Sequence, residues 1–350
     1  MFNYTRSRQI DRPQVQDIIN NSNIFTNYIE LSGDGKVGRD VCIRGGIALY
    51  KGLGCVVLGN YKGHTPQTMQ EANYGMASPH GYRFALRLMQ LAERFNMPVI
   101  TLVDTVGAWP TFDCESDGQS EAIGTRSLTH SLTHSLTHYL LTCLLTHSAT
   151  NLTIMAGLTV PIITIMVGEG GSGGALGICM GNTIGMLSGG YFGVISPEGA
   201  ASILGRYKDD AHKAKQFPLD CQELATAQCI YAYQLKEIGV VDEIIWEPVA
   251  VAETYKSYPV LTKRINNFIT SSLLALLPMS DQEIVSHRYK KFRSLGTFSI
   301  LNDDERQAMI ALASSKKSEK PSGSGATHSL THSLTLTHTH SHSLTHSLRC

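Results

Sequence analysis

Short apolar runs rich in β-branched residues recur along the chain and predict buried strands. Residues 99–103 and 161–167 are two of these runs, and residues 191–195 form another. Two further runs, 44–50 and 55–59, flank the tetrapeptide Lys-Gly-Leu-Gly, which is typical of an antiparallel hairpin. The chain is therefore expected to contain a sheet with both hairpin and crossover connections.

Other segments repeat their apolar residues with a helical period. Residues 81–95 place apolar side chains on one face and arginines on the other, which predicts an amphipathic helix that ends before Pro98. Residues 256–300 show a second helical pattern, and Ser-Pro-Glu at 196–198 is typical of a capped helix start. Alternating strands and helices predict an α/β fold with its active groups at the carboxyl ends of the strands.

The segment Gly-Glu-Gly-Gly-Ser-Gly-Gly-Ala at 168–175 lies between a predicted strand and apolar residues that suggest a helix. Its five glycines leave backbone N–H groups uncovered at the expected helix start, where the helix dipole also favours negative charge. The segment therefore predicts a site for an anion or an oxyanion. A tight strand-to-helix turn is the alternative interpretation.

Three chemistries are compatible with this segment. A phosphate-binding P-loop requires a lysine after the glycines, and none is present. An oxyanion hole uses backbone amides and needs no side-chain nucleophile. Gly170, Ser172 and Gly174 also match the G-x-S-x-G pattern of serine hydrolases, in which Ser172 would need a histidine and an acid later in the chain. The available partners are His212 or His287 with Asp209, Asp210 or Asp242.

Composition narrows the function classes. The 350 residues contain 29 Lys and Arg against 29 Asp and Glu, so the charge balance does not suggest nucleic acid or a membrane surface as a partner. No apolar run approaches the roughly 20 residues of a membrane helix, and the first residues lack a signal-peptide core. None of the eight cysteines forms a C-x-x-C pair, so we expect no zinc ribbon, no other metal site and a reducing compartment.

Most of the histidines belong to a repeat rather than to a metal site. Ten of the fourteen lie in Thr-His-Ser-Leu repeats, and a repeated ACTC tetranucleotide translates into this period. Removing residues 124–148 joins two halves of one amphipathic helix, so we hypothesise that this insert is a retained intron. The repeat from about residue 325 onward is interpreted as read-through sequence. Both segments are expected to be disordered, as is the linker at 316–325.

Several longer stretches, in order, resemble the α subunit of the bacterial and plastid acetyl-CoA carboxylase carboxyltransferase. The most specific are residues 81–105, the pair 118–123 and 151–178 on either side of the repeat, and residues 194–204. The resemblance runs from Arg12 to about Gly296. An ordered match of this length is more specific than any single glycine motif.

The resemblance implies a crotonase-like α/β fold, a ββα superhelix of the ClpP/crotonase type. It also implies transfer of a carboxyl group from carboxybiotin, carried by a biotin carboxyl carrier protein, to acetyl-CoA, giving malonyl-CoA for fatty-acid synthesis. A zinc-ribbon β subunit would complete the site, biotin carboxylase would be a further partner, and an α₂β₂ assembly is expected. The location would be cytoplasmic, or plastid if the N-terminus is incomplete.

The same resemblance points to site residues. We expect the backbone amides of Gly173 and Gly174 to form the oxyanion hole, with Gly170 and Gly171 next in order. Ser172 would then be a spacer that caps the helix. Gly107 and Ala108 are expected to provide a facing wall or second donor, and Lys62 is expected to contact substrate.

Two segments depart from the family pattern. The family usually shows DTPGAYPG, whereas residues 104–111 read Asp-Thr-Val-Gly-Ala-Trp-Pro-Thr. The segment 64–73 lacks the family's basic residues, which leaves Lys62 as the cation there. A catalytically inactive paralogue or mis-spliced product is therefore an alternative to the active subunit.

The predicted organisation has four parts. Residues 1–40 form an N-terminal segment, and residues 41–255 form the carboxyltransferase domain, interrupted by the insert at 124–148. Residues 256–300 form a helical segment, and residues 301–350 form the linker and low-complexity tail.

Overall fold

A computed structural model describes residues 4–8, 12–35, 38–119, 150–205, 207, 209–248, 259–296 and 307. The chain divides into two units, Met1–Ser294 and Leu295–Cys350, and every element below belongs to the first. The insert at 124–148 and the tail beyond about residue 325 lie outside the described residues, so their predicted disorder stays a prediction.

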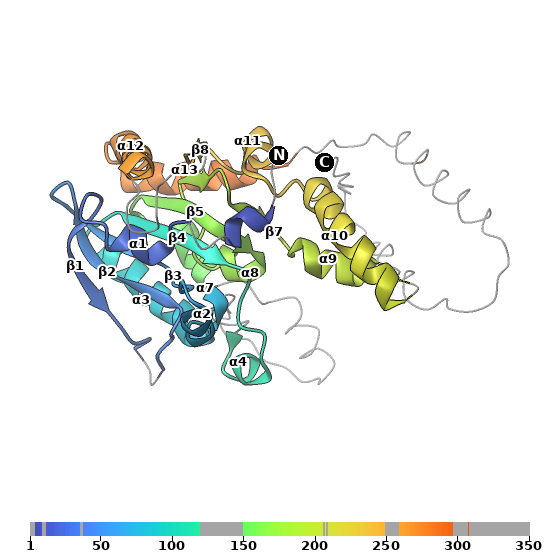
Figure 1. Cartoon of the computed structure of the whole chain (residues 1–350). Coiled ribbons are helices and arrows are strands. Elements are labelled where there is room, and N and C mark those ends of the chain that lie inside the picture. The colour runs from blue at the N-terminus through green and yellow to red at the C-terminus, as the bar shows by residue number, and fades with distance from the viewer. Residues whose placement is uncertain are drawn as a thin grey trace. The chain divides into compact units, whose positions relative to one another are not determined.

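A mixed sheet of eight strands forms the centre of the first unit (Figure 1). The order is β1-β2-β3-β4-β5-β6-β8, with β7 paired to the end of β5. The first three strands are antiparallel and the pairs from β3 onward are parallel. The strands are β1 Thr26–Leu31, β2 Ile43–Tyr50, β3 Leu53–Asn60, β4 Val99–Thr105, β5 Ile162–Gly171, β6 Thr183–Leu187, β7 Tyr191–Gly193 and β8 Glu243–Ile245.

The predicted hairpin is confirmed by strands β2 and β3. Tyr50 pairs with Leu53, which leaves a loop of Lys51 and Gly52. Both loop residues have positive φ, 48° and 85°, as a two-residue turn that matches the strand twist requires.

The helices confirm the two longest helical patterns of the sequence. Residues 81–94 lie in α3 and Phe95 is its C-cap, residues 256–300 contain α12 and α13, and Ser196 caps α9 by accepting the Gly199 N–H at 3.1 Å. The helical elements are η1 Tyr4–Arg8, α1 Val15–Ile19, α2 Pro66–Glu71, η2 Asn73–Gly75, α3 Pro79–Arg94, α4 Phe112–Ser116, α7 Thr150–Gly157, α8 Ser172–Leu176, α9 Pro197–Leu204, α10 Asp210–Ala227, α11 Ala232–Glu237, α12 Pro259–Leu276 and α13 Asp281–Arg293.

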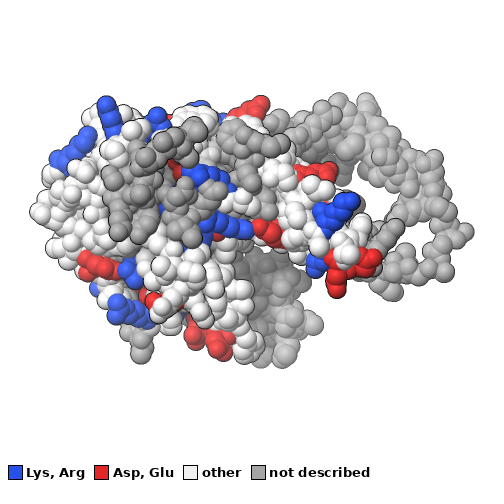
Figure 2. Space-filling model, in the orientation of Figure 1, with Lys and Arg blue, Asp and Glu red and all other residues white. Residues whose placement is uncertain are grey.

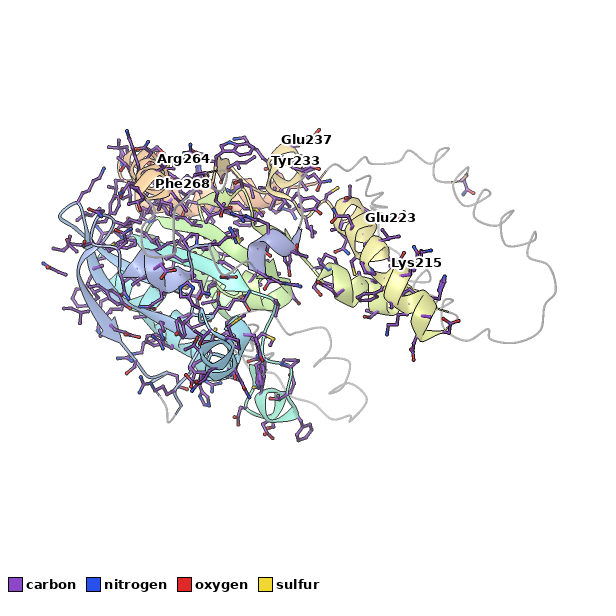
Figure 3. All side chains as sticks on the ribbon, in the orientation of Figure 1. Lys215, Glu223, Tyr233, Glu237, Arg264 and Phe268 are labelled. Atoms are coloured by element: carbon purple, nitrogen blue, oxygen red, sulfur yellow. The ribbon has the colours of Figure 1, made fainter. Side chains whose placement is uncertain are left out.

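Both faces of the sheet are covered, which explains why the runs at β4 and β5 are continuously apolar. Alternate residues such as Val103 and Met166 pack with α3 and α7 on one face. Ile100 and Ile165 point to the other face and pack with α1 and α12, where Phe268 is buried (Figure 3). The two layers hold β4 and β5 in the middle of the unit, so their carboxyl ends are positioned rigidly.

Both signs of charge are present on the surface. Lys and Arg are interspersed with Asp and Glu over the face seen in Figure 2, in keeping with the equal numbers of the two signs. None of the described helices combines the length and apolarity that crossing a membrane would require.

Candidate active site

The glycine segment begins as strand rather than as turn. Strand β5 continues through Gly171, because Gly170 and Gly171 pair with Phe192 and Gly193 of β7. The helix that follows, α8, has only five residues. The predicted strand was therefore too short and the expected helix too long, so the dipole of a full helix does not support this site. The first amides of α8 still lack partners within the helix, as at any helix start.

Ser172 does not cap this helix, contrary to the prediction. The N-cap is Gly171, and Ser172 is the first helical residue, with a φ of 55°. A positive φ is uncommon for a residue with a Cβ and marks a sharp change of direction. The turn leaves Ser172 exposed while Gly174 is buried.

The segment after β4 lies directly against the glycine segment. A Cβ on Gly171 would overlap the carbonyl of Val106, and a Cβ on Gly174 would overlap the backbone of Gly107 and Ala108. Only glycine permits this approach. The structure thus brings together Gly107, Ala108 and Gly174, which the sequence assigned to one site, although their roles stay predictions.

Local hydrogen bonds shape the facing segment. The Thr105 hydroxyl accepts the Gly107 N–H at 3.1 Å and donates to the Gly107 carbonyl at 2.6 Å. The Trp109 N–H donates to the Ala77 carbonyl at 3.0 Å, beside a short parallel bridge between Ala77 and Ala108. These bonds fix the conformation of residues 105–109 and tie them to Ala77.

A charge cluster lies at the glycine segment, and we call its buried members Lys62, Asp104 and Glu169, together with the exposed Arg8, the Lys62 cluster. The Lys62 ammonium contacts the Glu169 carboxylate and lies 3.5 Å from Asp104 Oδ1. Arg8 Nε donates to Glu169 Oε1 at 2.6 Å, and its Nη1 donates to Glu198 Oε1 at 2.5 Å. Lys62, Asp104 and Glu169 are each at most 5% exposed.

The two carboxyl groups of this cluster differ in their pKa. Burial raises the pKa of Asp104 above its ordinary value, and Lys62 offsets this only in part. For Glu169 burial acts in the same direction, but Lys62 and Arg8 outweigh it and lower the pKa. The two cations therefore hold Glu169 ionised inside the protein.

Sequence reasoning placed Lys62 among the substrate-binding residues and overlooked its neighbours. In the structure the Lys62 ammonium is engaged by two buried carboxylates, while its substrate role stays a prediction. Glu169 was visible as an acid within the glycine run, and Asp104 as an acid that ends an apolar strand. Arg8 carried no such signal, because 161 residues separate it from Glu169.

The histidine and acid residues that a serine hydrolase would need make hydrogen bonds elsewhere in the structure. Asp209 caps α10 by accepting the His212 N–H at 2.7 Å, and His287 lies 3.5 Å from the Asn182 amide. Asp242 accepts the Ile184 N–H at 2.6 Å. Among the described residues, no hydrogen bond joins any of these groups to Ser172, so the geometry does not favour a serine nucleophile.

A metal site is not suggested by the described part of the chain. No group of three or more His, Cys, Asp or Glu side chains there is arranged to hold an ion. The candidate site therefore consists of backbone amides, a glycine contact and a buried charge cluster.

Comparison with known proteins identifies the family. The family model described as acetyl co-enzyme A carboxylase carboxyltransferase-like matches residues 3–137 and 146–296. The chain belongs to this family. Among similar proteins, the acetyl-coenzyme A carboxylase carboxyl transferase subunit alpha of Oceanobacillus iheyensis is 41% identical over 292 residues, covering 83% of this chain and 80% of the relative. The subunit of the same name from Bacillus cereus is 40% identical over 296 residues, covering 85% and 79%.

Solved structures show the fold of this family member. The transcarboxylase 12S structure with hydrolysed methylmalonyl-coenzyme A has a TM-score of 0.54 and 19% identity; the match covers 78% of this chain and 45% of that one. The Pseudomonas malonate decarboxylase hetero-tetramer with malonate has a TM-score of 0.50 and 12% identity, covering 79% and 91%. The predicted crotonase-like α/β fold is confirmed.

Proposed function

We propose that this chain is the α subunit of an acetyl-CoA carboxylase carboxyltransferase, which transfers a carboxyl group from carboxybiotin to acetyl-CoA to give malonyl-CoA. The observation that carries the proposal is the family match across both sides of the insert, together with an intact glycine segment. Carboxybiotin supplies the activated carboxyl group when its carrier protein docks. Coenzyme A thioester is the second substrate.

The geometry favours one pair of amides within the glycine segment. Gly170 and Gly171 already pair with β7, whereas Gly173 and Gly174 lie in the first turn of α8, where N–H groups have no partner within the helix. We assign the oxyanion hole to Gly173 and Gly174, since amides held in place before reaction stabilise developing negative charge. Gly107 and Ala108 are the proposed facing wall.

The proposed assembly is larger than this chain. A zinc-ribbon β subunit, a biotin carboxyl carrier protein and biotin carboxylase are the proposed partners, with the carboxyltransferase as a cytoplasmic α₂β₂ complex. The relatives carry the word subunit in their names, which supports a multi-subunit enzyme.

Activity of the reconstituted complex tests the proposal. The chain is co-expressed with a β subunit of this family, purified as a complex, and assayed for malonyl-CoA-dependent carboxylation of biocytin. We expect carboxylation that depends on both subunits. A stable complex with no carboxylation above that of the β subunit alone would contradict the proposed function.

The insert calls for a separate comparison. We propose that residues 124–148 are a retained intron, and sequencing of the processed transcript tests this directly. A message that keeps the repeat contradicts the hypothesis. Assaying complexes with and without these residues then shows whether the longer chain is the catalytically inactive form.

A further inference from the structure

We propose that Lys62, Asp104 and Glu169 are positioning residues for the amides of Gly173 and Gly174, acting through a bulge in β5. This proposal rests on the proposed function. It assigns Lys62 a role different from the substrate contact that the sequence suggested.

The two strands lose their register just before the glycine segment. Val103 pairs with Met166, but the next pair is Thr105 with Gly170. One residue of β4, Asp104, therefore faces three residues of β5. The two additional residues form a bulge, which bends a strand and redirects whatever follows it.

Asp104 closes this bulge with its side chain. The backbone N–H of Glu169 donates to Asp104 Oδ1 at 2.9 Å, in place of a bond to the backbone of β4. A Cβ at Gly168 would overlap the same carboxylate, so glycine is required beside it. The Asp104 carboxylate thus substitutes for the missing backbone hydrogen bond and holds the bulged residues of β5 in position.

Lys62 and Arg8 make this arrangement stable in the interior. Asp104 and Glu169 are 3% and 1% exposed, and two carboxylates this close repel one another when both are ionised. Lys62 lies between them, and Arg8 and the Tyr191 hydroxyl, which donates at 3.1 Å, bind Glu169 Oε1. Without Lys62 the two carboxylates would lose the cation that lies between them, and only the more peripheral Arg8 and Arg12 would remain among the described cations near the bulge.

The bulge is close enough in sequence to set the proposed oxyanion hole. Three residues after Glu169 the chain turns sharply at Ser172, and Gly173 and Gly174 follow. Gly174 already lies in backbone contact with Gly107 and Ala108, so a shift of the bulge moves the amides relative to that wall. A displacement of about 1 Å at a reacting centre costs about 100-fold in rate.

The decisive experiment uses Lys62→Met in the complex with the β subunit. Carboxylation of biocytin is measured with malonyl-CoA and with malonyl-pantetheine, which lacks the nucleotide. We expect kcat to fall about 100-fold with both thioesters, while the KM for each thioester changes less than about threefold. Lys51→Met, at the exposed hairpin turn, is the matched control and should leave both constants unchanged.

Other outcomes overturn the proposal. An unchanged kcat shows that Lys62 does not position the amides. A raised KM confined to malonyl-CoA shows that Lys62 contacts the nucleotide phosphates. An inactive wild-type complex contradicts the proposed function itself, which separates the two failures.

A second pair of variants decides the matter if Lys62→Met does not fold. Asn at position 104 keeps an oxygen for the Glu169 N–H, whereas Ala removes it. We expect Asp104→Asn to keep at least about a tenth of kcat and Asp104→Ala to fall about 100-fold. Equal activity of the two variants contradicts a positioning role.

Discussion

Two buried cations in this protein have different kinds of partner: Lys62 is paired with carboxylates, whereas Arg288 is bound by neutral oxygen atoms. Lys62 lies between the carboxylates of Asp104 and Glu169, beneath the glycine segment. Arg288 of α13 is completely buried, and no carboxylate of the described residues lies within hydrogen-bonding distance of it. Its guanidinium donates to the carbonyls of Met155, Leu158 and Val160 at 2.6, 2.8 and 3.0 Å, and to Asn182 Oδ1 at 2.7 Å.

The pKa directions show what each environment provides. Burial lowers the pKa of Lys62, but the two carboxylates outweigh burial and raise it. Burial lowers the pKa of Arg288 to about 10, since carbonyl dipoles replace only part of the lost hydration. Two of the Arg288 acceptors, Met155 and Ala156, lie in the last turn of α7 and a third, Leu158, directly follows it, where a cation is favourable. Arg288 therefore fastens a helix, whereas the Lys62 cluster holds a strand distortion beside the site.

Arg288→Met is expected to give the largest change in stability. The variant leaves several buried carbonyls without a donor, each of which costs about 1–3 kcal/mol, so we expect a loss of about 4 kcal/mol in the free energy of unfolding. Urea denaturation measures this loss. The kcat of the folded complex should stay within about twofold, because α7 carries no proposed donor.

Arg293→Met is the control for this variant, because Arg293 is exposed in the last turn of the same helix. It should change stability by less than about 0.5 kcal/mol. A large loss of kcat in folded Arg288→Met would contradict the assignment of Arg288 to stability and of Lys62 to the site.

Gly174→Ala is expected to lower activity, whereas a similar substitution at the end of α7 is not. The new Cβ would overlap the backbone of Gly107 and Ala108, so one of the two segments must move. We expect kcat to fall at least about 100-fold in the biocytin assay. Gly157→Ala, at the end of α7, is the matched control, since no atom lies within 4 Å of its added Cβ. Similar activity of both variants would argue against a tight contact at Gly174.

Asn151→Ala should have an intermediate effect on stability. The Asn151 amide donates at 3.0 Å to the carbonyls of Tyr82 and Gly177, which joins α7 to α3 and to the end of α8. Loss of both buried bonds is expected to cost about 2 kcal/mol in urea denaturation. The exposed Asn267 of α12 provides the control, and an equal effect of Asn267→Ala would contradict this account.

The smallest expected effect is a pH dependence. In the unfolded chain the Asp104 pKa is about 3.8, and burial raises it in the folded state. Between these two pKa values the folded state keeps a proton that the unfolded state has released, so Asp104 makes stability fall as pH rises. Asp104→Asn removes this contribution. As the pH rises from about 4 to about 7, the unfolding free energy of the variant should therefore increase relative to that of wild type.

Urea denaturation of both proteins at the two pH values measures this difference. A difference in unfolding free energy that does not change with pH would show that Asp104 has no raised pKa in the folded protein.

Much of the fold was predictable because its signals are local. The hairpin at 44–59, helix α3 and the capped start of α9 follow from apolar period, turn glycines and capping residues. The end of β5 was not predictable in this way. Glycines have weak local preferences, and their pairing with β7 depends on residues that follow 22 positions later.

The site likewise has features that were predictable from local motifs and features that were not. The glycine segment and the wall at 107–108 were visible as motifs, and the structure brings Gly174 and the wall together. The partnership of Lys62 with Asp104 and Glu169 was not visible, because these two acids lie 42 and 107 residues away from Lys62 in the sequence. A lysine near a strand end suggests a substrate contact when its partners are unknown.

The sequence by itself determined the family, the crotonase-like class of fold and the positions of the longest helices and strands, because these depend on local pattern and on long ordered similarity. Only the tertiary structure decided where β5 bulges, which glycines meet a neighbouring backbone, and how each buried cation is compensated. Those features depend on the close approach of distant segments, where the space left for a Cβ and the placement of buried charge are set by packing.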